Sequence, residues 1–368
     1  MPAGSRCSRQ RRRLKPVSAA VLACVLAATS ASAQAPAPDP AAKAGPPYAF
    51  SGLVFGDYYY SSQDHDPAWE GAQGFRLRRI YFTFDYTFSP AISTRFRLEA
   101  NSPGQPGDDS LTPYVKDAYL RWTFFRQQAL TLGIQPTLSF NYVESVWGLR
   151  HIEKTPLDLY QWDSSRDTGI TVGGAVGKRR AVAWNLQFGH DRGRDADPDT
   201  YTALRAAIRL EPLKNLSVEA VGARLSREPD ARRSTGQIFV GYRGERARAG
   251  FQYSWQAQRP DAASGRPDRD VSIYSGFVVA DVKPRKLSAF ARIDRHDDPL
   301  PDGPSVDYLP IDPSAAFTLT IVGAEYYLIP SVRFSPNVEW VHYGAPSDPA
   351  VPGPKDDVVW RATFYWAW

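Results

Sequence analysis

The chain has 368 residues, of which 44 are Lys or Arg and 39 are Asp or Glu. Six of the basic residues and none of the acidic ones lie in residues 1–33. Residues 34–368 therefore have 38 basic and 39 acidic residues and a net charge of −1. This charge does not favour a nucleic-acid partner. Both cysteines, Cys7 and Cys24, lie in the same stretch, so disulfides, thiol catalysis and cysteine-bound metals are excluded from residues 34–368.

Residues 1–33 have the features of an export signal. A basic segment from Arg6 to Lys15 precedes a 13-residue apolar run, Val17 to Thr29, and then the cleavage pattern Ala31-Ser32-Ala33. The run is too short for a membrane-spanning helix, which needs about 20 residues. Lipoprotein processing at Cys24 is an alternative, but it would leave half of the apolar run on the mature chain. Residues 34–47, "QAPAPDPAAKAGPP", predict an extended Pro/Ala-rich leader.

From residue 48 onwards the sequence consists of short segments in which apolar and polar residues alternate. "IYFTFDYTF" places Ile80, Phe82 and Phe84 on one face, with Arg79 and Thr83 on the other. This period of two predicts β-strands. We expect about 16 of them, with 14 or 18 as alternatives, over residues 48–60, 75–88, 93–101, 114–124, 129–136, 169–177, 181–189, 200–211, 216–226, 235–243, 246–257, 271–282, 287–295, 315–328, 331–343 and 358–368.

Alternation alone fits a soluble β-sandwich as well as a transmembrane barrel. The connections favour the barrel, because long ones (61–74, 102–113, 137–168, 190–199, 227–234, 258–270, 296–314 and 344–357) alternate with tight turns. Long extracellular loops and short periplasmic turns are typical of outer-membrane barrels. The sequence therefore predicts an all-β, antiparallel transmembrane barrel over residues 48–368, wide enough at 16 strands to enclose an aqueous channel.

Five segments between Gly74 and Gly174 resemble, in this order, strands of the phosphate-selective porin O and P family of bacterial outer membranes. They are "GFRLRRIYFTFDYTFSP", "RFRLEAN", "KDAYLRW", "LTLGIQPTLSF" and "SSRDTGITVGG". The resemblance implies a trimeric 16-stranded channel that passes small anions. The family is known for lysines clustered at the constriction, whereas most lysines here fall in expected turns or loops, so phosphate and other small anions both stay open as solutes.

Arginines recur on the face that the alternation assigns to the lumen. Rings of arginine bias a pore towards anions, since guanidinium stays charged and binds carboxylate or phosphate through paired hydrogen bonds. Alternatively, they pair with lumen acids and stiffen the wall. The expected lumen arginines are Arg79, Arg95, Arg97, Arg121, Arg205, Arg209, Arg246, Arg248, Arg292 and Arg361, against the acids Asp85, Glu99, Asp117, Glu219 and Glu339.

The longest connection, residues 137–168, is the candidate constriction loop. It is rich in Trp, Tyr, Leu and Val, which suits a segment folded into the barrel against its wall. Its expected cationic contributors are Arg150, Lys154 and Arg166, beside Glu144, Glu153, Asp158 and Asp163. A loop held in place by its own ion pairs would have the same composition.

No chemistry-bearing motif suggests an enzyme or a cofactor. The five histidines are far apart in sequence, so no metal site is expected, and the acidic stretches "DHD" (64–66) and "GQPGDD" (104–109) fit solvated loops. Neither a P-loop nor a G-x-S-x-G pattern is present. Two functions remain: an outer-membrane porin for passive diffusion of small solutes, preferring anions, or a non-conducting surface receptor or adhesion barrel. The expected partners are outer-membrane lipid and lipopolysaccharide, small anions, the assembly machinery and two further copies of the chain.

The last segment, "VVWRATFYWAW", places Trp360, Phe364, Trp366 and Trp368 on one face. Its terminal aromatic resembles the signal by which the outer-membrane assembly machinery recognises its clients. The alternative is that Trp368 belongs to the aromatic girdle at the membrane interface.

Overall fold

A computed structural model describes residues 46–101, 111–125, 128–177, 181–190, 201–228, 231–260, 264–300, 309, 311–346, 350 and 352–368. The expected export signal, nearly all of the leader and the acidic stretch at 104–109 lie outside these residues. No helix within the described segments is long and apolar enough to cross a membrane.

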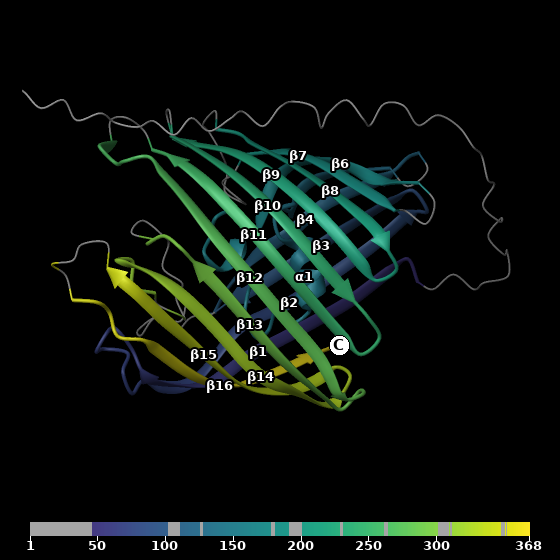
Figure 1. Cartoon of the computed structure of the whole chain (residues 1–368). Helices are drawn as coiled ribbons and strands as arrows, with labels where there is room; N and C mark the ends of the chain where they lie inside the picture. The colour runs from purple at the N-terminus through teal and green to yellow at the C-terminus, as the bar shows by residue number, and fades with distance from the viewer. Residues whose placement is uncertain are drawn as a thin grey trace, which may run out of the picture. The chain divides into compact units, whose positions relative to one another are not determined.

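The described strands close into one antiparallel barrel, in which each strand pairs with its neighbours in sequence and β1 pairs with β16 (Figure 1). This confirms the expected barrel of 16 strands. They are β1 (Tyr48–Gln63), β2 (Gln73–Ser89), β3 (Ile92–Asn101), β4 (Thr112–Thr123), β5 (Ala129–Pro136), β6 (Arg166–Val176), β7 (Val182–Gly189), β8 (Ala203–Leu213), β9 (Leu216–Glu228), β10 (Ala231–Arg243), β11 (Ala247–Arg259), β12 (Arg269–Lys283), β13 (Leu287–His296), β14 (Ala315–Ile329), β15 (Val332–Pro346) and β16 (Asp357–Ala367).

The two ends of the barrel carry different connections. At one end, here the short-turn end, the strands are joined by residues 90–91, 124–128, 177–181, 214–215, 244–246, 284–286 and 330–331. At the other, the long-loop end, they are joined by residues 64–72, 102–111, 137–165, 190–202, 229–230, 260–268, 297–314 and 347–356. The long connection expected at 227–234 is wrong, since β9 continues to Glu228 and β10 begins at Ala231. The polar run "REPDARRS" (227–234), with its proline, made this hairpin look like a loop in the sequence.

The outer face of the barrel is apolar and rich in aromatic side chains. Phe251 on β11 and Trp360 on β16 are 53% and 54% exposed. The next residue on each strand, Gln252 and Arg361, turns inwards and is buried, as the alternation predicts. Exposed apolar surface on this scale is what a lipid environment requires.

The inner face is not uniformly polar, which corrects the expectation from the sequence. Strands β10, β12, β13 and β14 turn large apolar side chains inwards, where they are buried. This apolar inner wall consists of Phe239, Ile273, Phe277, Phe290, Phe317, Leu319 and Ile321. On β14 the threonines Thr318 and Thr320 take the outward positions instead.

Residues 137–165, here called the inner loop, cover that wall. The loop contains two short helices, α1 (Asn141–Trp147) and α2 (Pro156–Leu159). α1 ends at Gly148, whose φ of 67° is the left-handed conformation that favours glycine. The apolar side chains of the loop are at most 2% exposed and form one core with the wall: Val143, Val146, Trp147, Leu149, Ile152, Leu157, Leu159, Tyr160 and Trp162. The long-loop connection between β5 and β6 therefore folds into the barrel and packs on one side of it.

The barrel closes between β1 and β16 down to the last residue. Gly52 and Trp368 exchange two backbone hydrogen bonds of 3.0 Å. The Trp368 ring lies over Gly52, where a Cβ atom would come within 2.1 Å of it, so a larger residue at this position would displace the ring.

Candidate channel constriction

Four of the arginines expected in the lumen hold the inner loop instead of facing open space, and one of them, Arg248 on β11, donates a hydrogen bond of 2.9 Å to the Trp147 carbonyl. Arg205 on β8 is fully buried and forms paired hydrogen bonds of 2.6 and 2.8 Å with Asp163 of the loop. It donates a third, of 2.6 Å, to Asp167 on β6. This arrangement satisfies the guanidinium along its whole edge and fixes the end of the loop to two strands.

Arg361 and Arg292 act on the middle of the loop in the same way. Arg361 on β16 lies 3.2 Å from Glu153 and 2.6 Å from Glu339. Arg292 on β13 donates to the Lys154 carbonyl at 2.5 Å and pairs with Asp294. Together with Arg205 on β8, these contacts from β13 and β16 attach the loop to well-separated strands of the barrel.

The arginines of β2 and β3 face the lumen but pair with carboxylates on neighbouring strands. Arg79 lies 2.7 Å from Glu99, and Arg95 holds Asp85 through two hydrogen bonds of 2.7 and 2.9 Å. Arg97 lies 3.4 Å from Asp117. Each pair stiffens the wall while reducing the positive charge that a passing anion meets.

Two further expected residues, Arg121 and Arg209, line a cavity of about 500 Å³ formed by residues of β4 to β8. The Arg209 guanidinium lies 4.1 Å from the centre of the Tyr142 ring of α1 and 4.0 Å from Glu219. Arg209 therefore contacts the inner loop at the edge of this cavity.

The loop's own cations are paired as well. Arg150 lies 2.9 Å from Glu144 and 3.1 Å from Asp158, and the Lys154 ammonium lies 3.9 Å from Asp158. Burial alone would raise the pKa of Asp158, but Lys154 and Arg150 outweigh it and hold that pKa below its ordinary value. Burial raises the pKa of Glu144 and lowers that of Lys154. The third expected loop cation, Arg166, is instead the first residue of β6, where it binds Asp117.

Sequence alternation missed several inward cations, and two of them lie at β-bulges. The register of β1 and β2 shifts between Phe55 and Gly56, so that Arg78 and Arg79 are consecutive yet both buried. Arg78 binds Asp57 at 2.6 Å and the carbonyl of Ile152 in the inner loop at 2.9 Å. A second shift places Lys116 inside, 2.9 Å from Glu99. The only signal was a pair of adjacent charged residues within each strand, Arg78-Arg79 and Lys116-Asp117.

Four arginines gather at the short-turn end, below α1. Together with Ser145, Glu245 and Asp281 they line a cavity of about 440 Å³. This arginine cluster consists of Arg243, Arg246, Arg248 and Arg333. The sequence placed Arg246 on a strand, but it lies exposed in the turn 244–246. Within the described segments no carboxylate lies within 4.0 Å of Arg243, Arg246 or Arg248, whereas Arg333 lies 3.4 Å from Glu325.

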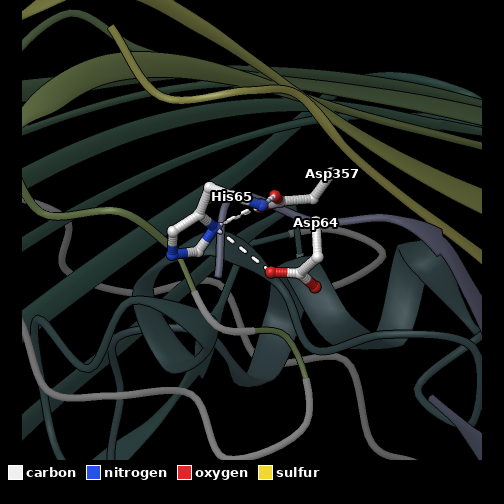
Figure 2. A group of neighbouring side chains, drawn as sticks. All are labelled: Asp64, His65 and Asp357. Carbon is white, nitrogen blue, oxygen red and sulfur yellow. Dashed lines mark hydrogen bonds and ion pairs between the residues drawn. The ribbon is translucent and has the colours of Figure 1, made fainter. Parts of the chain in front are cut away.

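Side chains that could hold a metal ion meet at the long-loop end. Asp64, His65 and Asp357 offer ligand atoms that all lie within 4.8 Å of one another (Figure 2). Spacing in the sequence could not reveal this group, because His65 and Asp357 are 292 residues apart and meet only when β1 pairs with β16.

Comparison with known proteins gives a likeness in structure alone. No protein-family model and no curated protein sequence matches the chain. The fold is similar to that of the anion-selective porin from Comamonas acidovorans (TM-score 0.64, 12% identity, 87% of this chain and 99% of that one). It is also similar to that of OmpF of Salmonella typhi in complex with daunomycin (TM-score 0.62, 10% identity, 87% of this chain and 97% of that one). A third similar structure is the trimer form of OmpT, an outer-membrane protein of Vibrio cholerae (TM-score 0.59, 12% identity, 87% of this chain and 99% of that one). The chain therefore shares the closed-barrel fold of these outer-membrane proteins.

Proposed function

We propose that the protein is an outer-membrane porin, a water-filled channel through which small solutes diffuse passively, with a preference for anions. The observation that carries the proposal is the inner loop, which folds into a closed barrel and packs its apolar side chains against one part of the wall, between β10 and β16. A loop that narrows the barrel from one side regulates passage without sealing it. The structural likeness to an anion-selective porin supports the same function.

The anion preference rests on the arginine cluster and not on the arginine rows expected from the sequence. Most arginines of those rows are balanced by carboxylates, whereas the cluster gathers four guanidinium groups around one cavity against three carboxylates, Glu245, Asp281 and the Glu325 that pairs with Arg333. Such an excess of positive charge raises the local concentration of anions. Phosphate and small carboxylates are the solutes whose oxygens fit guanidinium, and their competition with chloride current would rank them.

The selectivity of the channel should depend on this cluster. With Arg243, Arg246 and Arg248 all replaced by glutamine, we expect the reversal potential in a salt gradient across a planar bilayer to move towards the cation side. Arg295→Gln is the matched control, because Arg295 is an exposed arginine on an outward position of β13, paired with Asp297 at 2.9 Å. A cation-selective parent protein would refute the anion preference, and the absence of any current would favour a non-conducting receptor or adhesion barrel.

We further propose an outer-membrane location in a Gram-negative bacterium, export by residues 1–33, contact with lipopolysaccharide and assembly as a homotrimer. The trimer form of a structurally similar protein supports the last of these. Trp368 serves as part of the signal read by the assembly machinery, in addition to closing the β1–β16 pair.

Deleting Trp368 should reduce the yield of assembled barrel more than it changes conductance. The deletion removes both hydrogen bonds to Gly52 and the ring that covers it. Trp368→Phe keeps the backbone bonds and an aromatic ring, so we expect near-normal yield. Surface labelling and single-channel recording measure the two quantities, and a normal yield for the deletion would contradict the role of Trp368.

A further inference from the structure

Three potential metal ligands meet where the first and last strands of the barrel reach the long-loop end (Figure 2). Asp64 and His65 directly follow β1, and Asp357 is the first residue of β16. The His65 Nδ1 atom lies 3.0 and 3.1 Å from the two oxygens of Asp357 and 3.5 Å from Asp64 Oδ1. One ring nitrogen therefore points between two carboxylates that come from different ends of the chain.

The charge of the group is unbalanced for its degree of burial. Asp64 and Asp357 are each 1% exposed. The other groups that donate hydrogen bonds to them are neutral: the Ser61 hydroxyl and Asp66 N–H for Asp64, and the His65 N–H and Tyr343 hydroxyl for Asp357. A proton on His65 would balance only one of the two carboxylates. Since a buried charge is costly unless compensated, a divalent cation in place of that proton is the better match.

The spacing and chemistry of the donors indicate which cation. Ligand atoms around a tetrahedral ion with bonds of about 2.1 Å lie about 3.4 Å apart. The His65 Nδ1 atom lies 3.0 to 3.5 Å from the two carboxylates, and all the ligand atoms lie within 4.8 Å of one another. Imidazole nitrogen with carboxylate oxygen suits zinc and its first-row neighbours, whereas calcium and magnesium take oxygen ligands alone. The Tyr343 hydroxyl, 2.5 Å from Asp357 and 3.3 Å from His65 Nδ1, orients the carboxylate from the adjacent strand β15.

We propose that Asp64, His65 and Asp357 form a binding site for a divalent first-row transition metal, with zinc as its representative ion. The ligands come from both sides of the β1–β16 pair, so the bound ion links the two ends of the chain across the line where the barrel closes. Metal binding to the closed barrel alone stabilises it against unfolding, by an amount that grows with metal concentration. This site is independent of the channel function proposed above.

The test uses the purified full-length barrel in detergent, stripped with EDTA and dialysed against zinc chloride. We expect one zinc ion per chain by elemental analysis and a rise in the unfolding temperature on adding zinc. His65→Gln keeps the size and polarity of the side chain but not the ligand, and should weaken zinc binding at least about 100-fold.

The control is His342→Gln. His342 also pairs with an aspartate, Asp356 at 3.0 Å, but its side chain is 62% exposed and belongs to no such group among the described residues. It should bind zinc and respond in unfolding temperature like the parent protein. Asp64→Asn and Asp357→Asn should also weaken zinc binding. If either variant fails to fold, the comparison of zinc binding by His65→Gln and His342→Gln still tests the proposal. Equal zinc binding by these two variants, or no binding by the parent, would overturn the proposal, and a parent that prefers calcium over zinc would overturn the metal class.

Discussion

Replacing Trp147 with alanine is expected to release the inner loop from the apolar inner wall and to raise the single-channel conductance. Trp147 is fully buried, and its ring centre lies 5.1 Å from that of Phe277 and 6.2 Å from that of Phe290. Its indole N–H donates to the Glu153 carbonyl within the loop at 3.0 Å. Truncating a buried tryptophan lowers stability by about 3–5 kcal/mol. Here we expect that loss to weaken the packing of the inner loop against the wall.

The matched control is Trp360→Ala, which removes the same side chain from an outward, half-exposed position on β16. We expect it to leave conductance unchanged. Deleting residues 144–163 should raise the conductance further than Trp147→Ala does, although it also exposes the apolar inner wall to water. If conductance were the same in the Trp147 variant, the deletion and the parent, the inner loop would not narrow the channel.

Replacing Arg205 with methionine is expected to destabilise the barrel by about 3–5 kcal/mol, because it removes the guanidinium from two buried carboxylates. Asp163 and Asp167 are 3% and 0% exposed, so water does not readily take over the lost interactions. The unfolding temperature in detergent measures the loss. Adding Asp163→Asn and Asp167→Asn to the same variant should restore part of it, because the amides carry no charge to compensate.

Arg259→Met is the control for this substitution. The Arg259 side chain lies on β11 and is 39% exposed, with Asp270 at 2.6 Å and Asp268 at 3.5 Å. An ion pair of this kind contributes less than about 1 kcal/mol. Equal unfolding temperatures for the two variants would show that Arg205 does not anchor the loop.

The strands were predictable because alternation with a period of two is a local property of the chain. Residues 129–136 and 287–295, for example, were assigned from their own side chains and correspond to β5 and β13. Which face points inwards is not local, since it depends on what covers that face. Phe317, Leu319 and Ile321 point into the barrel only because the inner loop lies against them.

The sequence predicted which arginines point into the barrel at the candidate site, but not the groups with which they pair. The inward phase of Arg205, Arg292 and Arg361 follows from alternation, whereas their partners Asp163, Lys154 and Glu153 lie on a distant loop whose path the sequence does not encode locally. Arg78 and Lys116 were missed because a bulge changes the phase of a strand partway along it. Arg243 was missed because it ends a strand beside a turn, where alternation no longer assigns a face.

The contacts of the inner loop also constrain the order in which the protein folds. Apart from Arg78, the arginines that hold it come later in the chain: Arg248 is 101 residues beyond Trp147, Arg292 is 138 beyond Lys154, and Arg361 is 208 beyond Glu153. Contacts at such separations form slowly, because a long segment must be ordered before they are gained. The apolar helices of the loop therefore have to be kept from other partners until the last strand arrives, so that closure of the barrel and docking of the loop complete as one event.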